Sequence, residues 1–390
     1  MKNSTKMLVA ATVMACCSIK SYSQGNTTGL GNEHENTQSL AERVLNLEKK
    51  SDAINIYMNT QVAYQERFNG EDKGGSFVGR NLRFEMLGKL TDRWSYRFRY
   101  RLNRPGEHQD DNFSNNIDIM SVNYKATDRL TVSAGKHGVA LGGFQYDINP
   151  IQVLEFCDWL CGIDGFHMGV HAGYDLGKNN TLMLGLYNTN NNRAKRYYEE
   201  EPDLKDAKHP LAASLYWIGS VFGGKVQTLW SYSLIKEVKN NYGSMVALGT
   251  RLALPKWKVT VDYYGAWEQI DHHKTVSADM TAAYGTTTLA RGTCYNTVLV
   301  EVSHQPTPHW NCLVEGRIES ASARHNKTFH NYRTTYGYIA AVQWLPDLSQ
   351  DARISLAYIG KTIDFNNLCG LSDVNSNRIE LSLIYRIKAY

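Results

Sequence analysis

The stretch Trp94-Ser95-Tyr96-Arg97-Phe98-Arg99-Tyr100-Arg101-Leu102-Asn103 decides the fold. Aromatic and aliphatic side chains alternate strictly with serine, arginine and asparagine along it. This period of two is typical of a β-strand, whose successive side chains point to opposite faces. One face carries only large apolar groups, and the other carries three arginines. An arginine facing lipid near the bilayer midplane costs about 2–4 kcal/mol, so the arginine face must meet water.

The same alternation continues from residue 54 to the end of the chain. About sixteen such segments start near residues 54, 78, 94, 116, 130, 166, 181, 210, 225, 244, 257, 293, 309, 332, 352 and 376. Their apolar faces hold almost no Asp, Glu, Lys or Arg, although 21% of the chain is charged. This exclusion favours a lipid-facing wall. Because soluble β-sandwiches also alternate, the connections and the interfacial aromatic residues must decide between the two.

Short connections alternate with long ones along the chain. The short turns are near 91–93, 126–129, 177–180 and 222–224, and the longer loops are near 69–77, 104–115, 138–164, 191–209, 236–243, 271–292, 320–331 and 362–375. Five tryptophans stand near the turn-side strand ends: Trp94, Trp217, Trp257, Trp310 and Trp344. Both features are typical of outer-membrane barrels. No apolar run approaches the roughly eighteen residues of a membrane helix. The sequence therefore predicts an all-β fold, a transmembrane antiparallel β-barrel of about 16 strands over residues 52–390.

The N-terminus predicts export from the cytoplasm. Lys2 and Lys6 precede an uncharged run of about eleven residues, 7–17, and small residues at 21–23 predict cleavage before Gln24. Residues 1–23 are therefore expected to be a cleaved signal peptide. A lipoprotein box ending at Cys16 is the alternative.

The segment 24–51 is polar and precedes the barrel. Within it, residues 36–50 predict a short helix, because Leu40, Val44 and Leu47 recur at helical spacing. This periplasmic helix could be a small coiled coil at a trimer axis or a lone amphipathic helix at the barrel mouth. It is too short to be stable alone.

Overall charge gives little information about partners. The formal net charge of +4 falls to near +1 once the three lysines of the signal peptide are removed, so basicity does not argue for nucleic acid. Five cysteines remain, an odd number without metal-site spacing. Cys157 and Cys161 could form a disulfide in an oxidising compartment or remain free thiols.

Two stretches carry a resemblance to a known family. Gly79-Arg80-Asn81-Leu82-Arg83-Phe84-Glu85-Met86-Leu87-Gly88-Lys89-Leu90-Thr91-Asp92-Arg93-Trp94-Ser95-Tyr96-Arg97-Phe98 resembles the Arg-bearing hairpin of the phosphate-selective porin O and P family. Residues 117–135, followed by Lys136, resemble its next hairpin. The resemblance implies a sixteen-stranded, usually trimeric, anion-favouring porin of the Gram-negative outer membrane. The chain departs from the family at 135–140, and its loop 138–164 has no dense lysine cluster, so the expectation is a preference for anions as a class rather than strict phosphate selectivity.

Basic residues on the inferred inner faces are candidates for lining a water-filled channel. Arg97, Arg99 and Arg101 share one face, and Arg83 faces the same side from the preceding strand. The other basic candidates are Arg251, Lys258, Arg317, Arg333, Arg353 and Arg378. About fourteen bases face about eight acids on these faces, which predicts a modest anion preference. The alternative is that the arginines pair with acids such as Glu85 as struts, and both interpretations can hold together.

The long loop 138–164 is the candidate constriction of the channel. Gly142 and Gly143 would let it fold inward, and its aromatic residues would give it a packing face. The remaining candidate residues are Asp147, Glu155, Cys157, Asp158, Cys161 and Asp164, whose acids could face the arginines across the opening. The alternative is an ordinary surface loop.

Nothing in the sequence points to covalent chemistry. The histidines show no metal-ligand spacing, no phosphate-binding loop is present, and no Ser-His-Asn set points to a lipid-hydrolysing barrel. The expectation is passive diffusion of small anionic or polar solutes, without catalytic residues, cofactor, metal or nucleic acid, with outer-membrane lipid around a homotrimer. The alternative function is surface interaction or adhesion through the long loops at 191–209 and 271–292.

Overall fold

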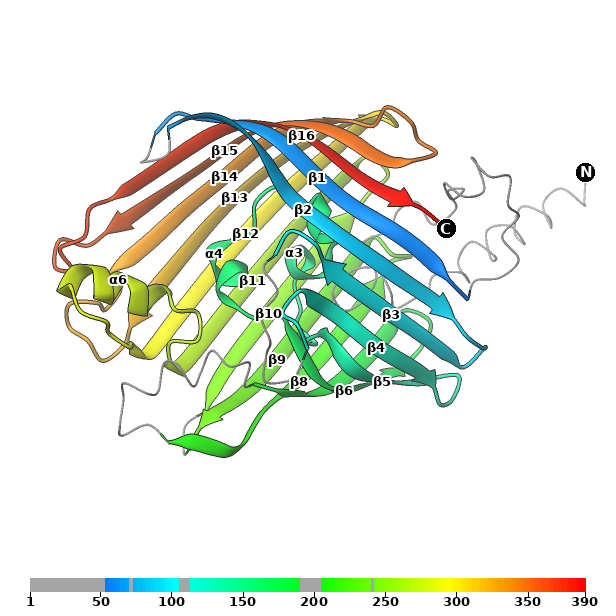
Figure 1. Ribbon diagram of the computed structural model, residues 1–390, viewed down its shortest axis with the longest axis horizontal. Helices are drawn as coiled ribbons and strands as arrows, with labels where there is room; N and C mark the ends of the chain where they lie inside the picture. The colour runs from blue at the N-terminus through cyan, green and yellow to red at the C-terminus, as the bar shows by residue number, and fades with distance from the viewer. Residues whose placement is uncertain (1–52, 70–72, 105–112, 190–204, 240–241) are drawn as a thin grey trace, which may run out of the picture.

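The computed structural model describes residues 53–69, 73–104, 113–189, 205–239 and 242–390. Its sixteen antiparallel strands form one closed barrel (Figure 1). The first eight are β1 (Asn55–Arg67), β2 (Gly74–Lys89), β3 (Trp94–Arg101), β4 (Ile117–Lys125), β5 (Leu130–Gly138), β6 (Phe166–Asp175), β7 (Asn180–Asn188) and β8 (Asp206–Val221). The others are β9 (Val226–Val238), β10 (Gly243–Ala253), β11 (Trp257–Ile270), β12 (Arg291–Thr307), β13 (Trp310–Ala323), β14 (Arg333–Trp344), β15 (Asp351–Phe365) and β16 (Val374–Lys388).

Each strand pairs with its sequence neighbours, and β1 pairs with β16 to close the ring. In that closing seam, Met58 lies opposite Ile387 and Tyr64 lies opposite Leu381. Closure leaves no unpaired strand edge, which is what allows a sheet to cross a bilayer. The predicted barrel of sixteen strands is confirmed. The signal peptide and the helix expected at 36–50 lie outside the described residues.

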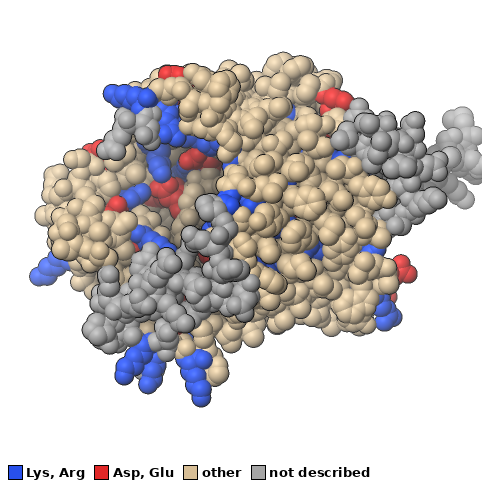
Figure 2. Space-filling model, in the orientation of Figure 1, with Lys and Arg blue, Asp and Glu red and all other residues tan. Residues whose placement is uncertain are grey.

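The two faces of the wall differ as the alternation requires. Ile318 is 56% exposed on the outside, whereas its neighbours Arg317 and Glu319 are 3% and 5% exposed on the inside. Leu184 and Leu215 likewise point outward. Figure 2 shows charged side chains gathered at the barrel ends and in the hollow at one mouth, with few on the wall between. An apolar outer band with a polar interior is the pattern of a lipid-embedded barrel.

The connections differ between the two ends of the barrel. Turns such as 90–93, 126–129 and 222–225 are short, and the C-terminus lies at that end (Figure 1). The opposite end carries the long loops, including the helix α6 (Thr275–Tyr284), which ends at Gly285 in the left-handed conformation, with a φ of 70°. The loop 271–290 folds back onto the barrel, because Asp279 of α6 lies 2.8 Å from Arg333 on β14. Residues 191–204, which are most of the other long loop expected to serve surface interaction (191–209), lie outside the described residues.

Three short helices lie inside the ring of strands, in the connection between β5 and β6. They are α3 (Phe144–Asp147), the 3₁₀ helix η1 (Pro150–Gln152) and α4 (Asp158–Gly162) (Figure 1). The side chain of Asn149 caps η1 by accepting a hydrogen bond from the Ile151 N–H. Among the described residues, no helix is long and apolar enough to cross a membrane.

Candidate pore and its inward loop

Residues 139–165, called here the inward loop, leave β5 and enter the barrel. The Gly142 N–H donates to Ser231 Oγ at 2.8 Å, and the Gly143 N–H donates to the Leu229 carbonyl at 3.0 Å. A Cβ on Gly142 would lie 2.4 Å from the Leu229 oxygen, and Gly143 has a φ of 90°. Close approach to the wall and a positive φ therefore both require glycine here.

Two wall carboxylates hold the inward loop by its backbone. Asp262 on β11 accepts hydrogen bonds from the N–H groups of Phe144 and Gln145 at 2.9 and 2.8 Å, and from the Tyr264 hydroxyl at 3.0 Å. Glu319 on β13 accepts from the N–H groups of Asp158 and Trp159 at 3.0 and 3.1 Å. Each carboxylate satisfies donors at the first turn of a short helix that have no partner within the helix.

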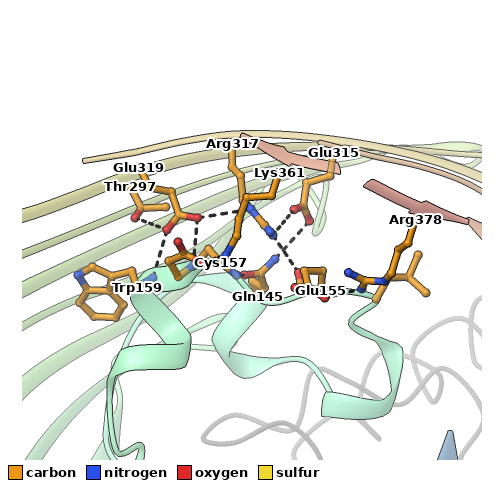
Figure 3. A network of polar contacts seen from close by, with 12 residues as sticks. Gln145, Glu155, Cys157, Trp159, Thr297, Glu315, Arg317, Glu319, Lys361 and Arg378 are labelled. Carbon is orange, nitrogen blue, oxygen red and sulfur yellow. Dashed lines mark hydrogen bonds and ion pairs between the residues drawn. The ribbon is translucent and has the colours of Figure 1, made fainter. Parts of the chain in front are cut away.

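Gln145 joins the two halves of the inward loop to the wall. Its amide donates to Glu315 Oε2 at 3.2 Å, and its carbonyl oxygen accepts from the Cys157 N–H at 2.9 Å. Figure 3 shows Glu315, Arg317 and Glu319 reaching from one strand toward this part of the loop. Arg317 Nη1 donates to Glu315 Oε1 at 3.2 Å and to the Glu155 carbonyl at 3.1 Å. The backbone of the loop is thus fixed from several directions.

The second half of the inward loop carries two acids that pair with wall bases. Glu155 Oε2 lies 2.6 Å from Arg378 Nη2 and 3.1 Å from Arg80 Nη2. Burial alone would raise the pKa of Glu155, but Arg378, with Arg80 and Arg317, outweighs it and lowers the pKa. The carboxylate therefore stays charged at neutral pH.

Asp158 forms the second pair of this kind. Its Oδ1 lies 2.7 Å from Lys361 Nζ, and its Oδ2 lies 3.2 Å from Arg333 Nη2. Burial again acts to raise the pKa of Asp158, and the charges of Lys361 and Arg333 lower it overall. Arg333 also pairs with Asp279 of α6 at 2.8 Å, so the pairing reaches the mouth of the barrel.

The arginines of the opening sequence all lie on the inner face. Arg97 pairs with Glu85 at 2.6 Å, while Asp118 on β4 lies 2.8 Å from Arg101 and 3.4 Å from both Arg83 and Arg99. Arg386 approaches Glu85 at 3.6 Å. Five guanidiniums thus share two carboxylates in these pairs. These contacts are of the kind that the strut interpretation expects, and the gathering of five basic side chains on the inner face is of the kind that the channel interpretation expects.

Three predicted basic residues lie apart from that cluster. Arg251 stacks on the Phe144 ring of the inward loop, with its Cζ 4.0 Å from the ring centroid, and its Nε donates to Thr260 Oγ1. Lys258 stands on β11 two residues before buried Thr260, so the alternation places it on the inner face. Arg353 pairs with Asp351 at 3.2 Å near the turn end of β15.

The other predicted loop residues lie along the inward loop. Asp147 is buried in α3. The backbone carbonyl oxygen of Asp164 lies 2.8 Å from His167 Nε2, within hydrogen-bond distance. Cys157 and Cys161 are free thiols in the structure. Burial raises the pKa of Cys157 well above its usual value and that of Cys161 to about 11, so neither forms a thiolate at neutral pH.

The sequence analysis did not single out five residues that hold this arrangement: Arg80, Asp118, Asp262, Glu319 and Lys361. The sequence offered one signal for these residues, which is the presence of an acid at an inward position of a strand. It could place Asp262 and Glu319 in the lumen but could not show that they bind loop backbone. Among the described residues, no group of three or more His, Cys, Asp or Glu side chains is placed to hold a metal ion.

Comparison with known proteins places this sequence in a family. The sequence model described as phosphate-selective porin O and P matches residues 54–387, which is nearly the whole described barrel. No curated protein sequence matches the chain.

Solved structures share the fold at low sequence identity. The outer membrane channel DcaP of Acinetobacter baumannii has a TM-score of 0.60 and 10% identity over 87% of this chain and 98% of its own. OmpT of Vibrio cholerae, solved in a trimer form, has a TM-score of 0.55 and 11% identity over 86% and 99%. OprB of Pseudomonas putida has a TM-score of 0.55 and 10% identity over 94% and 99%. All three likenesses concern the fold.

Proposed function

The chain belongs to the phosphate-selective porin O and P family and is an outer-membrane porin of a Gram-negative bacterium, and we propose that its channel favours anions. The observation that carries this proposal is the group of five inner-face arginines that share Glu85 and Asp118. Rings of basic side chains in a narrow, low-dielectric passage raise the local concentration of anions. Phosphate is one such anion, and the preference proposed here is for anions as a class.

The inward loop forms the constriction in this proposal. It occupies the lumen, and its acids Glu155 and Asp158 meet bases from β2, β14, β15 and β16. A solute then passes charged groups of both signs at this level before it reaches the arginine-rich wall. The ion pairs of Glu155 and Asp158 hold the loop in place. The cluster of arginines lies on the β2–β4 side of the lumen.

Reversal potentials test the anion preference. The double variant Arg83→Gln/Arg101→Gln removes two charges while leaving Asp118 its contact with Arg99. The chloride-to-potassium permeability ratio in a KCl gradient should fall by about half or more. Arg93→Gln/Arg129→Gln, in exposed turns, is the matched control. An unchanged ratio in the first variant would assign the arginines a purely structural role.

The proposal extends to export and assembly. Residues 1–23 act as a cleaved signal peptide, because their charge, apolar run and small residues fit that role. The barrels assemble as a homotrimer, as OmpT does in its trimer form. Light scattering of the detergent-solubilised porin should give three chains per particle, and a monomeric mass would contradict the trimer.

A further inference from the structure

We propose that the turn end of the barrel has a binding surface for anionic phospholipids, which extends along one arc of the outer wall. The surface comprises the five connections that follow β2, β4, β6, β8 and β10, which are consecutive around the ring. Short turns of an outer-membrane barrel face the periplasm, so the lipid is that of the periplasmic leaflet. The inference goes beyond the channel, because it concerns the outside of the wall.

Each of these five connections contains one basic residue, and all five are exposed: Arg93, Arg129, Lys178, Lys225 and Lys256. The adjacent strand ends add exposed Lys89 and Lys125. The acids of these connections are Asp92 and Asp128, and Asp128 pairs with Lys125 at 3.1 Å. The two other connections at this end, after β12 and β14, are fully described and contain no Lys or Arg. Bases therefore outnumber acids along one arc of this end.

The apolar band of the outer wall continues into the same turns. Leu90, Leu176 and Leu254 are all exposed. The Leu90 N–H donates to the Trp94 carbonyl at 2.9 Å, and the Leu254 N–H donates to the Trp257 carbonyl at 2.8 Å. Because paired residues of antiparallel strands share a face, these leucines continue the outer face of the tryptophans. Apolar side chains beside bases match the boundary between acyl chains and lipid phosphates, toward which lysine and arginine extend their charged ends.

Phe222, in the turn between β8 and β9, supports a membrane contact independently of charge. Its φ is 54°, in the left-handed region that bulky side chains rarely adopt. Gly223 and Gly224, which follow it, have φ values of 66° and 88°, where glycine is unstrained. The Phe222 side chain is 77% exposed, so packing within the protein does not offset this strain. Contact of the ring with the membrane interface supplies the missing compensation.

Anionic phospholipids match both parts of this arc. Their acyl chains lie against the apolar wall, and their phosphates lie level with the basic turns. A zwitterionic phospholipid offers the same acyl chains, but its own cation offsets the attraction of its phosphate to the bases. The preference therefore depends on the net charge of the lipid, and salt screens it because the bases are exposed.

Quenching of tryptophan fluorescence by brominated phospholipids tests the surface in the reconstituted porin. Exposed tryptophans stand at the turn-side ends of their strands and report on this end: Trp94, Trp257, Trp310 and Trp344. Brominated phosphatidylglycerol should bind about two- to fivefold more tightly than brominated phosphatidylcholine in about 0.1 M salt. The ratio should approach one in about 1 M salt, where charges are screened. Equal quenching at low salt would overturn the proposal without any variant.

A variant then assigns the preference to the turns. Replacing all five turn bases with glutamine should bring the ratio of the two lipids close to one at low salt. The matched control replaces five exposed lysines at the loop end with glutamine and should keep the ratio: Lys73, Lys205, Lys208, Lys239 and Lys327. A preference kept by the turn variant, or lost equally by the control, would contradict the assignment. Reversal potentials report the anion preference of the channel independently, so either proposal can fail while the other stands.

Discussion

At the scale of single residues, glycine sets how closely the inward loop approaches the wall. A methyl group on Gly142 would lie 2.4 and 2.6 Å from the carbonyl oxygens of Leu229 and Ala247. Backbone carbonyls of paired strands cannot move aside independently, so the loop must move away. The hydrogen bond from the Gly142 N–H to Ser231 then lengthens or breaks.

Gly142→Ala should therefore lower the free energy of unfolding by about 1–3 kcal/mol, the usual cost of overpacking. The displaced loop should also change the single-channel conductance. Gly79→Ala is the matched control, because a Cβ there meets no atom within 4 Å. Thermal unfolding in detergent and bilayer recording measure the two effects, and equal behaviour of the two variants would contradict the close packing at Gly142.

At the scale of elements, the inward loop is tied to the strands by charge. Glu155, whose pKa is lowered chiefly by Arg378 against the effect of burial, stabilises the folded loop wherever it is ionised. A carboxyl with a lowered pKa contributes stability above its ordinary pKa, near 4.3, and loses that contribution as the pH falls through the lowered pKa. The ion pairs of Glu155 with Arg378 and Arg80 are therefore intact at neutral pH and are lost only in acid.

Acidification should raise the anion preference. Protonation of Glu155, whose pKa is lowered chiefly by Arg378, removes a negative charge in acid and leaves Arg378 and Arg80 without that partner. The chloride-to-potassium ratio should rise as pH falls from 7 to 3, and Glu155→Gln should show the higher ratio at pH 7 with a smaller further rise. Asp364→Asn, on the exposed face of β15, is the control. A ratio that stays constant with pH would exclude this role of Glu155.

The strands themselves could be predicted because their signal is local. The alternation at 94–103 needs only neighbouring residues, and the predicted starts at 94, 130, 166 and 257 coincide with the observed strands. The contacts of the loop could not be predicted in this way. Glu319 binds the Trp159 N–H across 160 positions, and Arg378 meets Glu155 across 223. Such pairs depend on the path of the loop, which no periodicity encodes.

At the scale of the whole molecule, closure and charge separation follow from one topology. Strands β3 and β11 lie on opposite sides of the ring of sixteen. The arginine surplus belongs to β2–β4 and β16, whereas the acids that anchor the loop stand on β11 and β13. The sequence could assign these residues to the inner face, but only the closed ring places the two groups across from each other.

The loop that crosses the lumen also has a mechanical consequence. A thin-walled cylinder resists bending along its length but flattens readily under lateral pressure. Here Asp262 on β11 and Glu319 on β13 bind the inward loop from one side of the ring, and Arg80 on β2 binds it from another, so the loop acts as an internal brace. Lateral compression of the surrounding bilayer would have to break these bonds before the cross-section could become oval. The same hydrogen bonds that hold the loop inside the barrel therefore stiffen the wall.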